Sequence, residues 1–251
     1  MIEKRVYYSP TAEKLEALHK RIREHGASLV EKHGIENLGH FVPTGDNPEN
    51  KLVFFLGFAN QKAQQEAWAA FLADPEWIAV KAASEPDGGL VSKVESSLCA
   101  ATDYSPRGAR ATKHGGVFEL RTYTGPAERI FALHARFRDH TMGLFEKNGI
   151  KNIAYLSPFK TMTGVFAKDP PVAPEGEVLG QLIYMVGHES EAAAKVSWGF
   201  PSEENPKPTA FLADFLPIMK KSEEVAGGKL TLEEGGIVSE FLHATDYSAV
   251  Q

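Results

Sequence analysis

The sequence has few of the features that mark secreted, membrane-spanning or nucleic-acid-binding proteins. Cys99 is the single cysteine in 251 residues, which excludes an intramolecular disulfide and a metal site built from several cysteines. No apolar run approaches the roughly 18 residues that a membrane-spanning helix needs, so no membrane span is expected. The net charge of −6 and the pI near 5.9 provide no basic surface for a phosphate backbone. Nucleic acid is therefore not an expected partner.

Targeting signals and well-marked catalytic motifs are missing as well. The first predicted strand begins almost at Met1 and leaves no room for a signal peptide, so we expect a cytoplasmic protein. The sequence has no Gly-rich phosphate loop, no Gly-x-Ser-x-Gly nucleophile elbow and no His-Glu-x-x-His zinc helix. These absences exclude several enzyme classes without naming another.

The sequence does contain a long internal repeat. The repeated segments are 15–37 with 130–152, 3–7 with 119–123, and 102–105 with 245–248. A repeat of this length indicates a duplicated domain rather than a solenoid, whose units are shorter and more numerous. We therefore predict two domains, at 1–105 and 117–251, joined by a linker at 106–116.

Each half shows the order strand, long helix, strand, strand, helix, strand. In the segment 117–123, hydrophobic residues alternate with charged and polar ones, which is typical of a strand with two unlike faces. The βαββαβ order predicts an α+β fold of two ferredoxin-like repeats, each an antiparallel sheet with both helices on one face. Because the other face also needs cover, we expect the halves to pack sheet to sheet as an α+β barrel within one chain. The second half carries extra segments at 159–177 and 201–208, which we expect to be loops with a binding role.

Four motifs carry a resemblance to a known family. They are Glu-x-Arg-x-Tyr in both halves, Lys-His-Gly-Ile at 32–35, Ala-Asp-Pro-Glu-Trp at 73–77 and Asp-Tyr-Ser-Pro at 103–106. With them, the chain resembles a tandem NIPSNAP-domain protein, with one domain in each half. The resemblance implies a dimeric α+β-barrel fold, in which ferredoxin-like units pair through their sheets, but no catalytic residue set. Related barrel families include antibiotic-type monooxygenases and haem proteins that hold ligands between sheet and helices. Phe-Leu-Pro follows Asp214 where Pro-Glu-Trp follows Asp74, so the second helix of the second half is expected to start or end differently.

The first helix of each half offers candidate site residues. Its apolar positions recur at spacings of three and four, and this stripe includes His25 in one half and His140 in the other. Both imidazoles are therefore predicted to be buried against the sheet, as hydrogen-bonded core residues or as functional groups. His19 and His134 lie at the edge of the stripe, where partial exposure is expected. The arginines expected on the solvated outer flanks are Arg21, Arg23, Arg136 and Arg138.

The polar face of the first strand offers a second candidate. Glu119, Arg121 and Tyr123 project to one side about 7 Å apart. Their counterparts in the first half are Glu3, Arg5 and Tyr7. If buried, such groups must pair, so the set is either a structural ion pair or an anion-binding site. In the functional interpretation, Arg121 orients a carboxylate or enolate while Tyr123 or His140 moves a proton.

Residues that the repeat does not keep favour the second half as the working site. His188 replaces Phe58 and His243 replaces Ala100, so imidazoles stand where the first half has hydrophobic residues. Two histidines without a nearby carboxylate pair do not predict a metal site. Trp198 is expected in the core of its half, with a pocket wall as the alternative. The predicted catalytic residues are Glu119, Arg121, Tyr123 and His140, and the predicted ligand-binding residues are Arg5, Tyr7, His25, His134, His188, Trp198 and His243.

The predicted function is binding of a small apolar or aromatic molecule, in a pocket between the sheet and helices of at least one half. Cofactor-independent oxidation or isomerisation is a further option, and no cofactor or metal is expected. The alternatives are a non-catalytic ligand-binding or scaffold protein and a haem-binding oxidoreductase. A homo-oligomer is left open, and the sequence does not indicate which molecule is bound.

Overall fold

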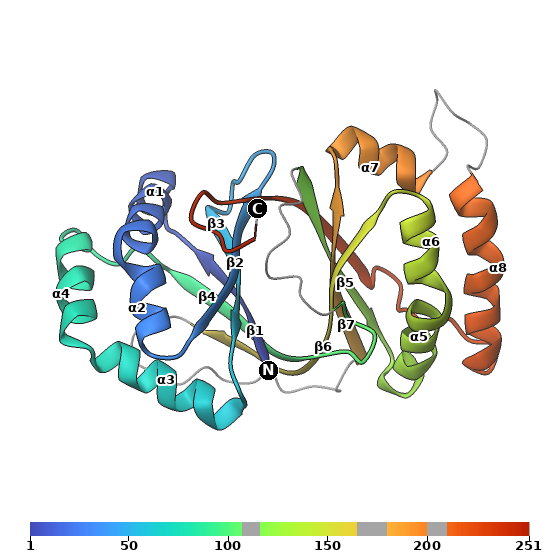
Figure 1. Ribbon diagram of the computed structural model, residues 1–251, viewed down its shortest axis with the longest axis horizontal. Coiled ribbons are helices and arrows are strands. Elements are labelled where there is room, and N and C mark those ends of the chain that lie inside the picture. Colours follow the sequence, from blue (N-terminus) through green and yellow to red (C-terminus); the bar gives the residue numbers. More distant parts are fainter. Residues whose placement is uncertain (107–115, 165–179, 200–209, 251) are drawn as a thin grey trace.

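Two four-stranded antiparallel sheets, joined edge to edge, enclose one hydrophobic interior. The computed structural model describes residues 1–106, 116–164, 180–199 and 210–250. The strands are β1 (Ile2–Tyr8), β2 (Glu36–Pro43), β3 (Lys51–Gly57), β4 (Lys93–Ala101), β5 (Val117–Gly125), β6 (Lys151–Gly164), β7 (Gly180–His188) and β8 (Ile237–Ala244). The helices are α1 (Ala12–Arg21), α2 (Ala27–Lys32), α3 (Gln61–Ala73), α4 (Pro75–Ser84), α5 (Ile130–Arg136), α6 (Met142–Lys147), α7 (Glu191–Trp198) and α8 (Ala210–Val225), with short turns η1 (Ile22–Gly26), η3 (Ala127–Arg129) and η4 (Phe137–Thr141). Figure 1 shows α1 to α4 on one side of the strands and α5 to α8 on the other.

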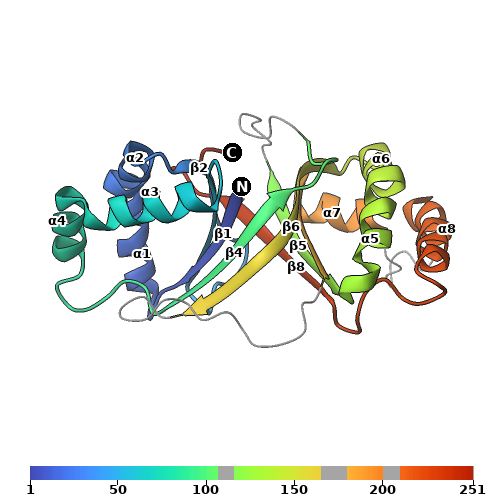
Figure 2. The ribbon, with the colours of Figure 1, turned by 90° about the horizontal axis from the view of Figure 1, so that it is seen from below.

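The halves meet through their edge strands. The strand order is β4-β1-β3-β2 in the first half and β6-β7-β5-β8 in the second, and pairing of β2 with β8 and of β4 with β6 closes the barrel. Figure 2 shows β4 and β6 side by side where the halves meet. The faces that the helices leave uncovered enclose a shared core that includes Val6, Phe41, Phe118 and Leu242. The predicted α+β barrel of two ferredoxin-like units is confirmed, and burial of these two faces is its physical reason.

Local signals in the sequence begin and end the helices. Thr11, Asn60 and Ser190 precede α1, α3 and α7, and each side chain accepts a hydrogen bond from the backbone three residues later. Gly34 and Gly149 follow α2 and α6 with φ of 73° and 75°, a left-handed conformation that favours glycine. Both glycines end the long first helix of their half where the sequence predicted it.

The second helical segment differs between the halves because a proline follows Asp74, whereas a phenylalanine follows the equivalent Asp214. Asp74 accepts a hydrogen bond of 2.8 Å from the backbone N–H of Glu76, and Pro75 occupies the first turn of α4. The chain therefore ends α3 and starts α4 in a new direction. In the second half Phe215 follows Asp214, and α8 continues through both residues. The difference predicted at this point of the repeat is confirmed.

Several predicted segments fall at or beyond the limits of the described residues. Positions 107–115 of the predicted linker, 165–177 of one predicted loop and the whole segment 201–208 lie outside them. Residues 159–164 were predicted as loop but extend β6, because they pair with β4 across the joint between the halves. The domain boundaries therefore stay predictions. Within the described ranges, no helix is both long and apolar enough to cross a membrane.

A π-helical turn inside the first helix of each half overturns one prediction. In η1 and η4 the hydrogen bonds span five residues, from the N–H of Ala27 to Ile22 and from that of Met142 to Phe137. Each π-turn adds one residue to the helical turn and rotates the positions around it. The predicted burial of both His25 and His140 is wrong: the two imidazoles are exposed, and the next residues, Gly26 and Thr141, are buried in their place.

Burial of the single cysteine leads to a simple test of the barrel interior. Cys99 is fully buried in the barrel core, and burial raises the pKa of its thiol to about 12. Because the thiolate is the reactive form, we expect no reaction of the folded protein with Ellman's reagent at mildly alkaline pH. Unfolding in guanidinium should release one reactive thiol per chain. Reaction of the folded protein at the rate of a small free thiol would contradict this barrel.

Candidate functional site

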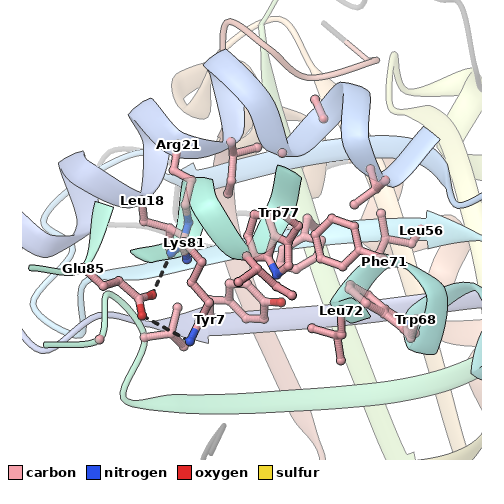
Figure 3. A pocket seen from close by; sticks show the side chains of 18 of the residues that line it. Tyr7, Leu18, Arg21, Leu56, Trp68, Phe71, Leu72, Trp77, Lys81 and Glu85 are labelled. Atoms are coloured by element: carbon pink, nitrogen blue, oxygen red, sulfur yellow. Dashed lines mark hydrogen bonds and ion pairs between the residues drawn. The ribbon is translucent and has the colours of Figure 1, made fainter. Parts of the chain in front are cut away.

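A cavity of about 690 Å³ lies between the sheet and the helices of the first half. Its floor comes from β1, β2 and β3, and its walls come from α1, η1 and α2 on one side and from α3 and α4 on the other. Figure 3 shows aromatic side chains gathered around it. The rings that line it are Tyr7, Phe54, Trp68, Phe71 and Trp77. Small-molecule sites have volumes of about 300–1,000 Å³, so this cavity has the size of a ligand site.

Larger residues of the first helix fill the equivalent space in the second half. Ile22 and Val30 line the cavity. Their counterparts in the repeat, at the offset of 115, are Phe137 and Phe145, and both rings are 1% exposed. Exchange of an aliphatic side chain for a phenyl ring at both positions removes free volume between helix and sheet.

Two positions on the sheet show the same difference. The cavity residues His40 and Phe54 correspond in the repeat to Tyr155 and Tyr184. These tyrosines are fully buried and stack on one another, with ring centroids 5.4 Å apart. The second half therefore has an aromatic core at the place where the first half has a cavity.

Helix α4 completes the cavity of the first half. Because the break at Asp74 redirects the chain, Trp77, Ile78 and Lys81 of α4 line the cavity. The ring of Trp77 lies 4.4 Å from that of Phe71, which joins the two helices at the cavity wall. In the second half, the continuous α8 packs instead against α5 and α6, as Figure 1 shows.

His40 is one of two polar side chains of the cavity floor, with Tyr7. It is 4% exposed, and its ring stacks on Phe54 with centroids 5.1 Å apart. Its Nδ1 is buried and has no hydrogen-bond partner among the described residues. Burial, together with the nearby His19, lowers the pKa of His40 to about 3. The imidazole is therefore neutral at physiological pH, and its buried Nδ1 lacks the partner that buried polar groups normally have.

An ion-pair cluster lies at the edge of the cavity. Arg21 Nη1 is 2.7 Å from Glu85 Oε1, and Lys81 Nζ is 3.2 Å from Glu85 Oε2, as drawn in Figure 3. Arg21 and Arg136 were predicted on solvated flanks, but they are 6% and 4% exposed. That prediction is wrong because α4 covers Arg21 on α1 and α8 covers Arg136 on α5. Arg23 and Arg138 are exposed as predicted.

The polar face of β1 forms a buried network behind the cavity wall. Glu3 is fully buried and accepts hydrogen bonds from Arg5 Nε at 2.6 Å, Gln64 Nε2 at 3.0 Å, Trp68 Nε1 at 2.9 Å and Ser96 Oγ at 2.6 Å. Burial by itself would raise the pKa of Glu3, but the charge of Arg5 and the donors outweigh it and lower this pKa. Since Trp68 lines the cavity, the network fixes one of its walls.

The second half has the corresponding network around Glu119. This carboxylate binds Arg121 Nη1 at 3.2 Å, His188 Nε2 at 3.0 Å, Trp198 Nε1 at 2.7 Å and the hydroxyl of Ser239. His188 and Trp198 are buried, and Nε2 of the imidazole that replaces Phe58 binds a carboxylate of its own half, while its buried Nδ1 has no partner among the described residues. This partner is 69 positions away, and no pattern in the sequence pointed to it. The ligand-binding and catalytic roles assigned to these residues stay predictions.

The remaining candidates are spread over the molecule. Tyr123 is buried in the aromatic core of the second half. His243 is exposed on β8, opposite Val42 at the joint between the halves. In the part of the chain that the structure describes, no three His, Cys, Asp or Glu side chains are grouped so as to hold a metal ion.

Sequence reasoning assigned no site to the repeated Thr-Asp-Tyr-Ser segments, yet each docks onto the opposite half. The hydroxyl of Tyr247 lies 2.6 Å from His19 Nδ1, and that of Tyr104 lies 2.7 Å from His134 Nδ1. His19 is buried and His134 is half-buried by this contact. The sequence signal for these contacts was that both the tyrosine and the histidine of each pair recur in the repeat. Two halves related by a pseudo-two-fold axis make the same contact twice, so both members of the pair are present in each half.

The aspartates of these segments make matching ion pairs across the joint. Asp246 accepts two hydrogen bonds from Arg23, of 2.7 and 2.8 Å, and Asp103 accepts one of 2.8 Å from Arg138. All four side chains are largely exposed, so these pairs contribute little to stability.

Comparisons with known proteins agree with this architecture. Residues 2–106 match the family model described as NIPSNAP. A NIPSNAP family protein from Agrobacterium tumefaciens is 23% identical over 42% of this chain and 96% of its own, with a TM-score of 0.36. An anthrone oxidase-like protein is 11% identical over 97% of this chain and 90% of its own, with a TM-score of 0.51. A search of curated proteins finds no match. The predicted NIPSNAP resemblance is confirmed at residues 2–106, and the full-length similarity shows the barrel fold.

Proposed function

We infer that this α+β-barrel chain, with its NIPSNAP domain at residues 2–106, binds a small aromatic or apolar molecule in the first-half cavity. One observation carries the proposal: a cavity of ligand size is walled by aromatic rings, and its floor includes the neutral imidazole of His40. Sites for small molecules combine a mostly apolar lining with a few placed polar groups in this way.

The arrangement of the lining indicates what the molecule looks like. Trp68, Phe71 and Trp77 present ring faces and edges that pack well on a flat apolar body. His40 offers a hydrogen bond to a single hydroxyl or carbonyl group at the floor. A flat ring system with one polar substituent fits both features.

Binding is the function that the geometry supports best, ahead of oxidation or isomerisation without a cofactor. Both of those reactions need a base that removes a proton from the ligand. Two groups in the cavity have a lowered pKa that makes them weak bases: burial lowers that of His40 to about 3, and Arg21 lowers that of Glu85 against the effect of burial. Bases with such low pKa values accept protons poorly at neutral pH.

The proposal places the working site in the first half, opposite to the location predicted from the sequence. In this proposal, the two halves are copies of one unit, and the second copy has a packed aromatic core in place of the cavity. His188, which suggested a site in the second half, is used there to satisfy Glu119.

Isothermal titration calorimetry with 2-naphthol, 2-methylnaphthalene and 1-decanol tests the proposal. We expect saturable binding of one molecule per chain, with 2-naphthol tightest because it supplies both a flat ring and a hydroxyl. His40→Phe keeps a ring on the floor, so it should weaken 2-naphthol about tenfold, the effect of one hydrogen bond to a buried group, and leave 2-methylnaphthalene unchanged. Absence of saturable binding for all three compounds would refute a cavity for flat apolar ligands.

A further inference from the structure

The position of His40 is set by the C-terminal segment of the opposite half. The backbone N–H of Thr245 donates to the carbonyl of His40 at 2.9 Å, and the backbone N–H of His40 donates to Ser248 Oγ at 2.9 Å. The ring of Tyr247 meets the His40 ring edge to face, with centroids 5.2 Å apart. The His40 ring also stacks on Phe54, so it contacts two aromatic rings.

Tyr247 itself does not line the cavity, so it acts on a ligand only through His40. Its hydroxyl is anchored by His19 at 2.6 Å, and the neighbouring Asp246 is anchored by Arg23. Both anchors lie on the first helix of the first half. The segment 245–248 thus bridges that helix and the cavity floor.

The repeat of this segment makes the same contacts to Tyr155, which belongs to the packed aromatic core of the second half. Thr102 donates its backbone N–H to the carbonyl of Tyr155 at 2.9 Å, and the N–H of Tyr155 donates to Ser105 Oγ at 3.0 Å. The rings of Tyr104 and Tyr155 lie 5.5 Å apart. Tyr155, however, donates its hydroxyl to Asn152 and is fully packed. The chain therefore contains two near-identical docking segments, one behind the His40 floor of the first-half cavity and one behind the packed Tyr155, although Ser105 also lines a smaller cavity of about 170 Å³ in the barrel interior.

We propose that the Thr-Asp-Tyr-Ser segment at 245–248 is a positioning element of the first-half ligand site, whereas its repeat at 102–105 serves only to join the halves. The inference rests on the proposed function, because positioning of His40 matters to a ligand only if the cavity binds one. It makes the site composite: the first half supplies the lining, and the second half fixes the orientation of its polar group.

A thermodynamic consequence follows from this division. Docking of 245–248 and ligand binding both favour the same orientation of His40, so each strengthens the other by the same factor. The repeat at 102–105 has no such link, because Tyr155 offers no atom to a ligand. Ligand affinity should therefore respond to one segment and not to the other, even when both contribute equally to stability.

The test compares Tyr247→Ala with the matched Tyr104→Ala by two measurements. The first is the imidazole resonance of His40 in NMR spectra across pH, assigned by its loss in His40→Phe; it needs no ligand. In Tyr247→Ala the ring loses its cover and gains water, so its pKa should rise toward the ordinary range, while in Tyr104→Ala it should not move. The second is the dissociation constant for 2-naphthol, expected to rise about tenfold in Tyr247→Ala and to stay within about twofold in Tyr104→Ala.

Two milder variants protect the test against loss of folding. Tyr247→Phe keeps the ring against His40 and should retain wild-type affinity despite the lost contact to His19. Ser248→Ala removes the acceptor of the His40 N–H and should shift the His40 resonance. An unchanged His40 pKa in Tyr247→Ala and Ser248→Ala overturns the positioning role, and so do equal changes in Tyr104→Ala. Because the NMR readout is independent of any ligand, failure to bind 2-naphthol with a shifted pKa would count against the proposed function alone.

Discussion

Replacement of Ile22 and Val30 by phenylalanine, the residue at both equivalent positions of the second half, should abolish ligand binding and leave the fold intact. The two side chains line the cavity from the first helix. In the second half Phe137 and Phe145 occupy the same positions and are almost completely buried. The double variant therefore gives the first half a packing that this chain already uses.

The expected loss of affinity for 2-naphthol is at least about 100-fold, since a filled cavity has no room for the ring system and overlap costs several kcal/mol. The melting temperature should be unchanged or higher, because filled free volume adds contacts between side chains. Calorimetry measures the first quantity and a thermal unfolding scan the second. Retained binding together with a wild-type melting temperature would show that the ligand lies elsewhere.

The reverse double variant, Phe137→Ile with Phe145→Val, is the matched control. It removes buried rings from a packed core and should lower the free energy of unfolding by about 2–4 kcal/mol. It leaves the lining of the first-half cavity untouched, so 2-naphthol should bind that cavity as in the wild type. A loss of affinity equal to that of the filling variant would mean that stability, not volume, controls binding.

The order of strands and helices was predictable because the signals that produce it are local. Alternation along 117–123, the caps before the helices and the glycines after them each depend on a few adjacent residues. The barrel followed from one further physical requirement, that the uncovered sheet faces be buried. The long internal repeat supplied the two equal halves that meet this requirement.

The orientation of the first helix was not predictable from its period. The stripe of apolar residues placed His25 and His140 inward, but the π-turn at the same point in each half breaks the period of 3.6 residues. A single π-turn leaves no mark in the sequence pattern. Whether such a turn forms depends on how the helix packs against the sheet. The hydrophobic pattern therefore gives the correct helix and correctly buries Leu29 and Leu144, but it misplaces His25 and His140, which lie within the π-turns.

The location of the cavity was present in the sequence as differences of size rather than of polarity. Comparison of the repeats emphasised His188, a polar replacement, and so favoured the second half. The decisive replacements are Ile22 against Phe137 and Val30 against Phe145, which are apolar in both halves. Such changes do not alter the polarity of a position. Only the packed structure shows that together they leave a cavity in one half and a filled core in the other.

Removal of the buried carboxylate in Glu3→Ala should cause one of the two largest losses of stability expected from a single substitution in this chain. Four donors converge on Glu3, and the variant leaves the buried guanidinium of Arg5 without its carboxylate at 2.6 Å. Breaking a buried ion pair from one side costs about 3–5 kcal/mol. Denaturant unfolding measures this loss. As a contrast, Asp246→Asn breaks an exposed pair and should cost less than about 1 kcal/mol.

The equivalent Glu119→Ala separates the structural role of this network from its role in the cavity. Both carboxylates are buried with a lowered pKa, so both variants should lose similar stability. Only Glu3 holds Trp68 in the cavity wall, so only Glu3→Ala should also weaken 2-naphthol binding. The pH dependence gives a further check, because the stabilising effect of Glu3 is complete above its ordinary pKa of 4.5 and is lost as the pH falls through its lowered value. The stability difference between wild type and Glu3→Ala should therefore shrink on acidification, and a difference that grows below pH 4.5 would show that Glu3 is buried in its neutral form.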